Sequence, residues 1–384
     1  MVSKRLQSVP VSGTVKISNV VSQLRQEGVD VLSFSMGEPD FSTPDNIIGS
    51  CIASLEDKFT QYTPSLGIPE LREAIARKTR EDNRIDCQAS NVLVTPTKHA
   101  IFMAALAYLD PGDEVLLSDP SWVTYEACIR LAGASPAYVP TSDETGFAMT
   151  PESVLQRVTS RTRMIILNSP SNPTGSVMSE EDIRAIADIA RDHDIIVLSD
   201  EIYEKIIYEG KHFSIASLDG MFDRTLTVNG LSKTYSMTGW RLGWVVASEE
   251  NISAINRLQT HSVTCCTSFT QPAAVEALQG PQDEMRRMVE QFRHRRDLVC
   301  DLIEDIPGLD CVRPQGAFYV FPRYEADMNS EDFATHLLKE AHVAVTPGGA
   351  FGPCGEGHFR LSYAASEEHI KEGLARIDDA IRRL

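Results

Sequence analysis

Between two runs that are typical of buried strands lies the sequence Asn229-Gly230-Leu231-Ser232-Lys233-Thr234-Tyr235-Ser236-Met237-Thr238-Gly239-Trp240-Arg241-Leu242-Gly243-Trp244. The preceding run is Thr225–Val228, and the following run, Arg241–Ala247, alternates small and apolar residues. Lys233 stands among small hydroxylated residues and glycines, and Arg241 follows eight positions later. The pattern predicts that one loop between two strands presents a lysine and an arginine.

A lysine in such a setting is suited to react with a carbonyl group. Desolvation and a nearby cation lower the pKa of the amine, and the neutral amine forms a Schiff base. Arginine binds a dianionic phosphate through its planar fork of donors. An aldehyde and a phosphate on one ligand indicate pyridoxal 5′-phosphate (PLP). A Ser-Lys dipeptide alone is usually a solvated turn, so the prediction depends on the offsets of Gly239, Arg241 and Gly243.

With these offsets the stretch resembles the lysine signature of class I aminotransferases, which are fold type I PLP enzymes, and it is closest to the prokaryotic aspartate aminotransferases. The resemblance runs from about Gly37 to the C-terminus. It implies an α/β fold in which a large domain has a mainly parallel seven-stranded sheet flanked by helices, with a small α+β domain beside it. We expect the large PLP-binding domain at 44–282 and the small domain at 283–384, with an N-terminal arm and part of the small domain at 1–43.

Short apolar runs agree with this fold, because they alternate with helical segments from residue 91 onwards. They are Val92–Val94, Val115–Leu117, Ala134–Val139, Met164–Leu167 and Ile195–Leu198. Such alternation predicts a mainly parallel sheet with helices on both faces, and ligands of such sheets bind beyond the carboxyl ends of the strands. Further strands are predicted at Pro314–Phe321, Val343–Thr346 and His358–Tyr363.

Asp200 closes the run Ile195–Leu198, where a buried carboxylate is costly unless it is paired. A protonated pyridine nitrogen is such a partner, and it makes the cofactor ring an electron sink. The resemblance implies that Tyr203 and Asn172 donate to the phenolate oxygen of PLP, and that Asn172 also meets the substrate carboxylate. We therefore expect Lys233, Asp200 and Tyr203 to be the catalytic residues.

The phosphate of PLP is expected at the start of a helix, where free backbone N–H groups bind anions. Thr97 and Lys98 occupy such a position after the strand at Val92–Val94. The resemblance adds Ser232 and Arg241 to the phosphate site and makes Trp122 the aromatic residue that stacks on the pyridine ring and borders the substrate.

The resemblance also assigns residues to the substrate and to a second subunit. Arg360 would clamp the α-carboxylate as a bidentate donor, and Gly37 would face the bound amino acid at the mouth of the site. Lys98 would meet a distal carboxylate, and Thr14 would lie in an arm that closes over acidic substrates. Tyr62 would reach the phosphate of the neighbouring subunit, which implies a homodimer with shared active sites.

Composition excludes several classes of protein. A net charge of −18 argues against a nucleic-acid partner, which would require a basic face. No apolar run approaches the roughly 20 residues that span a bilayer, and the N-terminal residues lack the apolar run of a signal peptide. The eight cysteines show no CxxC pair and no regular spacing with histidine. We expect a cytoplasmic protein with reduced thiols, no metal and no membrane partner.

The function that the resemblance implies is a PLP-dependent transaminase with a ping-pong Schiff-base mechanism. Aspartate and 2-oxoglutarate are the first expected substrates, and small amino and oxo acids are the expected partners. Aromatic amino acids, prephenate or alanine are alternative substrates, and a carbon–sulfur β-lyase would share nearly all of these residues. A PLP-binding regulator without turnover is disfavoured, because the chain shows no basic DNA-binding extension.

Overall fold

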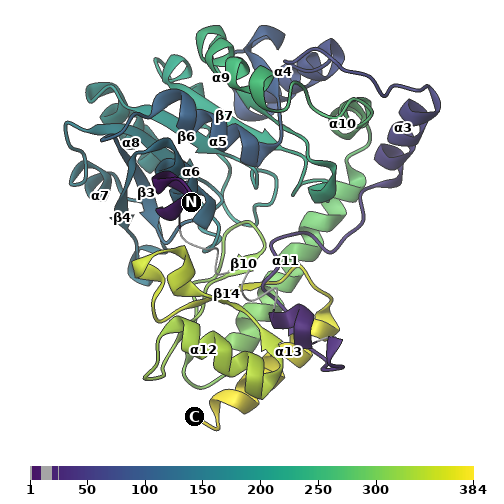
Figure 1. Cartoon of the computed structure of the whole chain (residues 1–384). Helices are drawn as coiled ribbons and strands as arrows, with labels where there is room; N and C mark the ends of the chain where they lie inside the picture. Colours follow the sequence, from purple (N-terminus) through teal and green to yellow (C-terminus); the bar gives the residue numbers. More distant parts are fainter. Residues whose placement is uncertain (1, 10–19, 25) are drawn as a thin grey trace.

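The computed structural model describes residues 2–9, 20–24 and 26–384, and its central element is a seven-stranded sheet (Figure 1). In chain order the strands are β2 (Val92–Val94), β3 (Glu114–Asp119), β4 (Ser135–Pro140), β5 (Thr162–Asn168), β6 (Ile196–Asp200), β7 (Thr225–Gly230) and β8 (Gly243–Val246). Their order across the sheet is β2-β8-β7-β6-β5-β3-β4. β8 is antiparallel to both neighbours and every other pairing is parallel, so the expected mainly parallel α/β sheet is confirmed.

Helices cover both faces of the sheet, which explains why its strands are apolar almost throughout. α5 (Thr97–Tyr108), α6 (Val123–Ala132) and α9 (Glu249–Ser262) pack on the face that contains Leu117. α7 (Pro151–Leu155) and α8 (Glu180–Asp192) cover the opposite face, towards which the preceding Leu116 points, since successive side chains of a strand alternate. On the same side, α3 (Asp45–Glu56), α4 (Pro69–Asn83) and α10 (Thr270–Gln279) cover β2 and β8.

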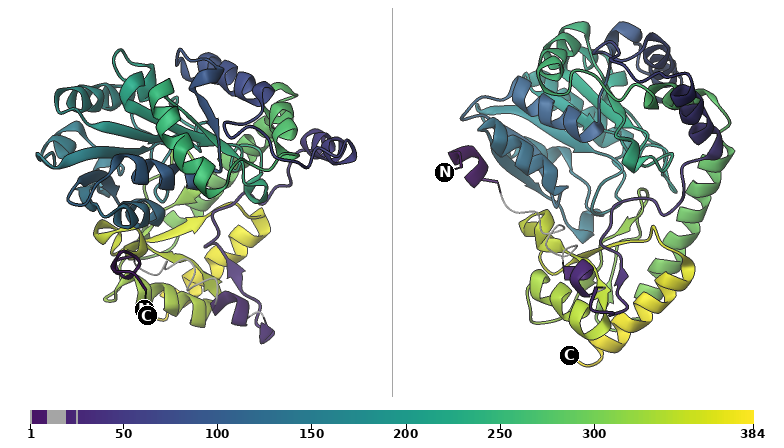
Figure 2. Two further views of the ribbon diagram at one scale, coloured as in Figure 1. Left: turned by 45° about the horizontal axis from the view of Figure 1, so that its top comes forward. Right: turned by 45° about the vertical axis from the view of Figure 1, so that its right-hand side comes forward.

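A second group of elements follows α11 (Asp283–Glu304), the long helix that runs down one side of the molecule (Figure 2). The helices of this second group are α12 (Ser330–His336) and α13 (Glu367–Ile381), and a π-helical turn follows α12 at Leu337–Ala341. Its short strands are β9 (Leu309–Asp310), β10 (Tyr319–Val320), β11 (Arg323–Tyr324), β12 (Val343–Ala344), β13 (Thr346–Pro347) and β14 (Phe359–Ser362). β1 (Leu32–Ser33) pairs in parallel with β12, and Phe34 enters the core of this part. The short α1 (Lys4–Gln7) lies against α6.

The strand predicted over Pro314–Phe321 is wrong in its first half, because only β10 pairs with β14. The N–H groups of residues 315 and 316 donate instead to the carbonyl oxygen of Gly175, and Ala317 donates to that of Ile206. These partners belong to loops of the large sheet, so this segment links the sheet to the C-terminal elements. Among the described residues, no helix has the length and apolar character needed to cross a membrane.

Candidate active site

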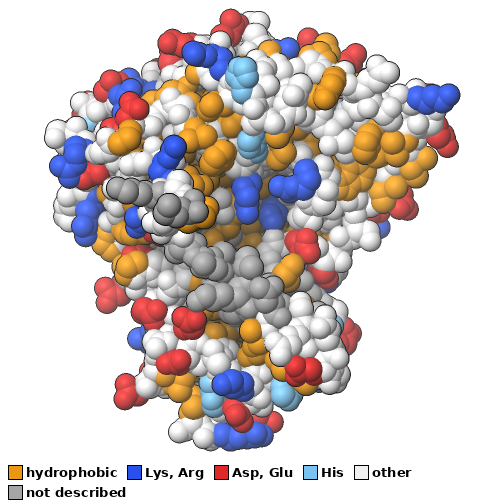
Figure 3. Space-filling view, in the orientation of Figure 1, with side chains coloured by type: hydrophobic (Ala, Val, Ile, Leu, Met, Phe, Trp, Pro, Cys, Tyr) orange, Lys and Arg blue, Asp and Glu red, His pale blue; other side chains and the backbone are white. Residues whose placement is uncertain are grey.

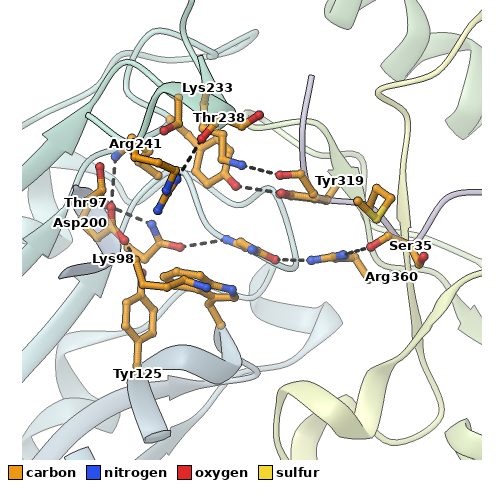
Figure 4. A pocket seen from close by; sticks show the side chains of 18 of the residues that line it. Ser35, Thr97, Lys98, Tyr125, Asp200, Lys233, Thr238, Arg241, Tyr319 and Arg360 are labelled. Carbon is orange, nitrogen blue, oxygen red and sulfur yellow. Dashed lines mark hydrogen bonds between the residues drawn. The ribbon is translucent and has the colours of Figure 1, made fainter. Parts of the chain in front are cut away.

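A cavity of about 520 Å³ lies at the carboxyl ends of β5, β6 and β7, where the large sheet meets the C-terminal elements (Figure 4). Lys and Arg side chains gather in this hollow near the middle of the face shown in Figure 3. Most of the predicted site residues line the cavity, namely Gly37, Thr97, Lys98, Trp122, Asn172, Asp200, Tyr203, Ser232, Lys233, Arg241 and Arg360. Tyr62 does not line it and is 87% exposed, and Thr14 lies outside the described residues.

Lys233 follows β7 on the loop that returns to β8, and its ammonium group points into the cavity (Figure 4). The Nζ atom donates a hydrogen bond to the carbonyl oxygen of Gly37. Burial lowers the pKa of Lys233 to about 8, and the positive charge of Arg360 adds to this effect. The neutral fraction of this side chain near pH 7 is therefore larger than that of an ordinary lysine, which favours its use as a nucleophilic or proton-accepting amine.

Two glycines allow the start of α5 to approach this lysine loop. Gly230 ends β7 and pairs with Gly243 at the start of β8. The hydroxyl of Thr97 lies so close to both that a Cβ atom on either glycine would collide with it. The same hydroxyl donates to the carbonyl oxygen of Asn229 at 3.3 Å. Thr97 is the first residue of α5, so the free N–H groups of a helix start lie next to the two glycines that flank the lysine loop.

Asp200 is the last residue of β6, and only 2% of its surface is exposed. One carboxylate oxygen accepts a hydrogen bond from the Tyr125 hydroxyl at 2.7 Å, and the other accepts one from the Ile202 N–H at 3.2 Å. Burial raises the pKa of Asp200 to about 6, although these two donors and Lys233 oppose the increase. Among the described residues it forms no ion pair of its own, so a cationic partner in the cavity would relieve its burial.

Arg360 projects from β14 and is buried, with 3% of its surface exposed. Its Nη1 atom donates to the Asn172 side-chain oxygen at 3.0 Å, and Nη2 donates to the Ser35 carbonyl oxygen at 2.6 Å. The rings of Tyr319 and Phe351 lie 4.6 and 5.1 Å from the guanidinium carbon. The Nε atom is buried without a partner in the described structure, and the acceptors around the group are neutral. The guanidinium is thus available to an anion in the cavity.

A second cationic group and an aromatic face lie across the cavity. Lys98 Nζ is 4.8 Å from the centre of the Trp122 ring, which is a cation–π distance. Burial lowers the pKa of Lys98, and the nearby charge of Arg241 lowers it further. Arg241 has left-handed backbone geometry, with φ of 57°, and its Nη1 atom donates to the Thr238 carbonyl oxygen at 2.9 Å. These contacts concentrate positive charge near the start of α5.

A family model described as aminotransferase class I and II matches residues 29–377. The chain belongs to this aminotransferase family. The aminotransferase is 44% identical over 394 residues to a probable aspartate/prephenate aminotransferase of Aquifex aeolicus, with 100% of this chain and 99% of the relative covered. It is 41% identical to the aromatic-amino-acid aminotransferase 2 of Thermococcus litoralis, with 99% and 98% covered. The solved aspartate aminotransferase of Thermus thermophilus with maleate matches with a TM-score of 0.94 at 40% identity, over 99% of each chain.

The aminotransferase uses PLP, and the cavity contains groups that fit each part of this cofactor. The buried Asp200 carboxylate fits a protonated ring nitrogen, because no cationic group among the described residues forms an ion pair with it. Lys233, with its lowered pKa, fits the aldehyde. The N-terminus of α5 together with Arg241 fits a phosphate, since helix starts and guanidinium groups both bind such anions.

Sequence reasoning did not identify eight other residues that line the cavity of the aminotransferase: Ser35, Met36, Tyr125, Asn168, Ile202, Thr238, Leu242 and Tyr319. The hydroxyl groups of Tyr319 and Tyr203 are hydrogen-bonded at 2.8 Å, and this bond helps to fix the position of the Tyr203 ring. Tyr125 lies in the first turn of α6, three residues after Trp122. Nothing in the sequence around it indicates the hydrogen bond to Asp200, which lies 75 residues away.

A cluster of buried charges lies directly behind Asp200. Glu201 accepts hydrogen bonds from Ser199 and Ser214 and pairs with His212 Nε2 at 2.8 Å. Glu204 pairs with the Lys78 ammonium group, which also donates to Asn83 at 2.6 Å. Two carboxylates, one ammonium and one imidazole therefore form a paired network, in which protonation of the imidazole balances the charge.

Proposed function

We propose that this aminotransferase moves the amino group of aspartate to 2-oxoglutarate. The observation that carries the proposal is the arrangement of cations around the cavity. Arg360 offers an Nε atom that has no partner among the described residues and a guanidinium whose acceptors there are neutral, which suits one carboxylate. Lys98 lines the same cavity and offers a second cation for a distal carboxylate. The relatives named for aspartate, and the solved one named with maleate, support a dicarboxylic substrate.

Each side chain has a proposed role in holding the cofactor. The N–H groups of Thr97 and Lys98, the Ser232 hydroxyl and the Arg241 guanidinium hold the phosphate, and Trp122 stacks on the ring. Asp200 holds the proton of the ring nitrogen. Asn172 and Tyr203 donate to the phenolate oxygen. When bound, PLP supplies an aldehyde that carries the amino group and a ring that accepts the electron pair released at the substrate α-carbon.

Proton transfer is the proposed task of Lys233. Its amine would accept the proton from the substrate α-carbon and hold it within the site for return, and the pKa of about 8 suits both accepting and releasing a proton near neutral pH. Arg360 fixes the α-carboxylate, so that the α-hydrogen faces Lys233. The backbone carbonyl of Gly37, which accepts from Lys233 in this structure, borders the substrate at the mouth of the cavity.

We further propose a cytoplasmic homodimer with shared active sites. Exposed apolar residues cluster on and after α3, where Figure 3 shows an apolar surface, and they are Ile52, Leu55, Phe59 and Tyr62. Tyr62 is 87% exposed, and exposed apolar patches of this kind mark interaction surfaces. Its hydroxyl would donate to the cofactor phosphate of a neighbouring subunit. All eight cysteines are free thiols, in keeping with a reducing compartment. We also propose two domains, with residues 44–282 forming the large one and residues 283–384 the small one. Residues 1–43 would form an N-terminal arm and part of the small domain, and Thr14 in this arm would close over the substrate.

A panel of amino donors tests the substrate. The holoenzyme is mixed with aspartate, alanine, phenylalanine or a cysteine conjugate, and a single turnover is followed at the cofactor absorbance. We expect aspartate to react fastest, and Lys98→Ala to slow aspartate by about tenfold to a hundredfold, the range for one charged hydrogen bond, while alanine is unchanged. Equal slowing of alanine and aspartate would refute the role of Lys98. Pyruvate and ammonia released from the cysteine conjugate would show a β-lyase instead.

A further inference from the structure

Tyr125 is the only tyrosine among the described residues that bonds to the Asp200 carboxylate, and it lies in the cavity lining. We propose that Tyr125 is a positioning residue of the transamination reaction: its hydroxyl holds the Asp200 carboxylate ionised and aimed at the ring nitrogen of bound PLP. The proposal rests on the assignment of Asp200 to that nitrogen in the proposed function. Tyr125 itself is not assigned to the cofactor or the substrate.

The geometry around Asp200 shows why one hydroxyl matters. A carboxylate has about four acceptor sites, and the described residues use two of them, one by Tyr125 at 2.7 Å and one by the Ile202 N–H at 3.2 Å. The two donors bind different oxygens, so together they fix the rotation of the group. The Tyr125 bond is the shorter one, and removing it leaves a long backbone contact as the single direct constraint on a carboxylate that is 2% exposed.

The position of Tyr125 on α6 couples this constraint to the aromatic wall of the cavity. Trp122 is the residue before α6, and the Tyr125 N–H donates to its carbonyl oxygen at 3.0 Å. The two rings meet edge to face, with centres 5.4 Å apart and planes at 89°. One helical turn therefore holds the proposed stacking ring and the donor to Asp200 in fixed relation. A shift of this turn would move the ring-binding face and the carboxylate together.

A purely structural role for Tyr125 is the competing explanation, because its ring is 2% exposed and belongs to the core beneath α5 and α6. Phenylalanine would fill the same space, so a structural role predicts little effect when only the oxygen is removed. Burial and the Asp200 charge raise the pKa of Tyr125 well above its ordinary value. The hydroxyl thus remains protonated over the working range of pH, and it acts as a permanent donor to Asp200.

The test compares Tyr125→Phe with Tyr108→Phe. Tyr108 lies on α5, and its hydroxyl donates to Asn251 at the same distance of 2.7 Å, but it is outside the cavity lining. We expect Tyr125→Phe to lower kcat about tenfold to a hundredfold, the range for a bond to a charged group, with KM changed less than about threefold. Tyr108→Phe should leave both constants near those of the wild type. Equal effects of the two variants would overturn the proposal.

Two readouts besides activity separate positioning from loss of structure. With PLP labelled with ¹⁵N in the ring, Tyr125→Phe should move the nitrogen signal from the protonated towards the neutral position at fixed pH, and Tyr108→Phe should not. Tyr125→Phe should also weaken the binding of PLP but not of 1-deaza-PLP, which has no ring nitrogen. Equal weakening of both cofactors, or an unchanged ¹⁵N signal, would contradict the proposal.

The controls also distinguish this inference from the proposed function. If the wild-type protein does not transaminate any donor in the panel, the proposed function fails and the assignment of Asp200 fails with it. If the wild type is active and Tyr125→Phe behaves like Tyr108→Phe in activity, ¹⁵N signal and cofactor binding, only the role of Tyr125 is overturned.

Discussion

Replacement of Arg360 by lysine tests the proposed clamp for the α-carboxylate, because it keeps the charge and removes the fork of donors. The guanidinium now donates hydrogen bonds of 3.0 Å to Asn172 and 2.6 Å to Ser35, and its carbon lies 4.6 and 5.1 Å from the ring centres of Tyr319 and Phe351. A lysine ammonium is a point charge that cannot give a planar bidentate contact and hold both neighbours as well. We therefore expect Arg360→Lys to lose at least one charge-assisted hydrogen bond to the substrate.

One such bond contributes about 1.5–3 kcal/mol, so kcat/KM for aspartate should fall about tenfold to more than a hundredfold. The assay is the single-turnover rate at increasing aspartate concentration, in the holoenzyme. A donor amine without an α-carboxylate should react equally with the wild type and the variant, because the lost bond is absent from both reactions.

Arg296→Lys is the matched control. Arg296 is also buried, with 5% exposed, and it stacks 5.2 Å from the centre of the Tyr208 ring and donates to Glu209 at 2.7 Å. It lies outside the cavity lining, so its replacement should affect stability but not the selectivity for α-carboxylates. If Arg360→Lys keeps kcat/KM within about threefold of the wild type, or slows both donors equally, the clamp is refuted.

Three further predictions address other parts of the site. Lys233→Ala should abolish turnover, and borohydride reduction of the wild-type holoenzyme should place the cofactor label on the peptide that contains Lys233; a label on another lysine would contradict the assignment. Burial lowers the pKa of His212, but the charge and hydrogen bond of Glu201 outweigh it, so the pKa of His212 in the folded protein is raised. The His212–Glu201 pair therefore stabilises the folded protein fully below the unfolded-state pKa of about 6.5, and this stabilisation is lost as pH rises through the folded-state pKa. The difference in melting temperature between the wild type and His212→Gln should therefore shrink as pH rises, and a constant difference would show that this pair does not titrate as described. Gly243→Ala should weaken PLP binding, because its Cβ would displace Thr97, whereas Gly49→Ala has open space around its Cβ and an ordinary backbone conformation and should leave PLP binding unchanged; equal PLP affinity in Gly243→Ala and the wild type would refute the steric argument.

The parts of the fold and site that were predictable from sequence are those with a local signature. The lysine loop could be recognised because Lys233 and Arg241 need fixed offsets, and the strands of the large sheet because both of their faces are apolar. The roles of the individual site residues remain predictions. The buried state of Arg360 was not visible, since an arginine in a short strand is usually exposed, and its partner Ser35 lies 325 residues away.

Other features escaped prediction because they depend on distant partners. Tyr125 looks like an ordinary core aromatic in the sequence, and only the folded chain brings its hydroxyl to Asp200. The segment that begins at Pro314 was predicted to be a strand, yet the N–H groups of its first half bond to loops at Gly175 and Ile206. Apolar alternation predicts which side of a segment is buried, but it does not identify the acceptor for each backbone donor.

The hydrogen bond between Arg360 and Ser35 has a consequence for biosynthesis. All seven strands of the large sheet, with Lys233 and Asp200, lie before residue 247, whereas β14 follows more than a hundred residues later. A nascent chain can therefore assemble the wall that faces the cofactor well before the substrate-orienting guanidinium leaves the ribosome. Only when β14 arrives does the guanidinium join the segment around residue 35 to the loop of Asn172. During synthesis, the chain should thus become able to bind PLP before it can bind the α-carboxylate of the amino acid.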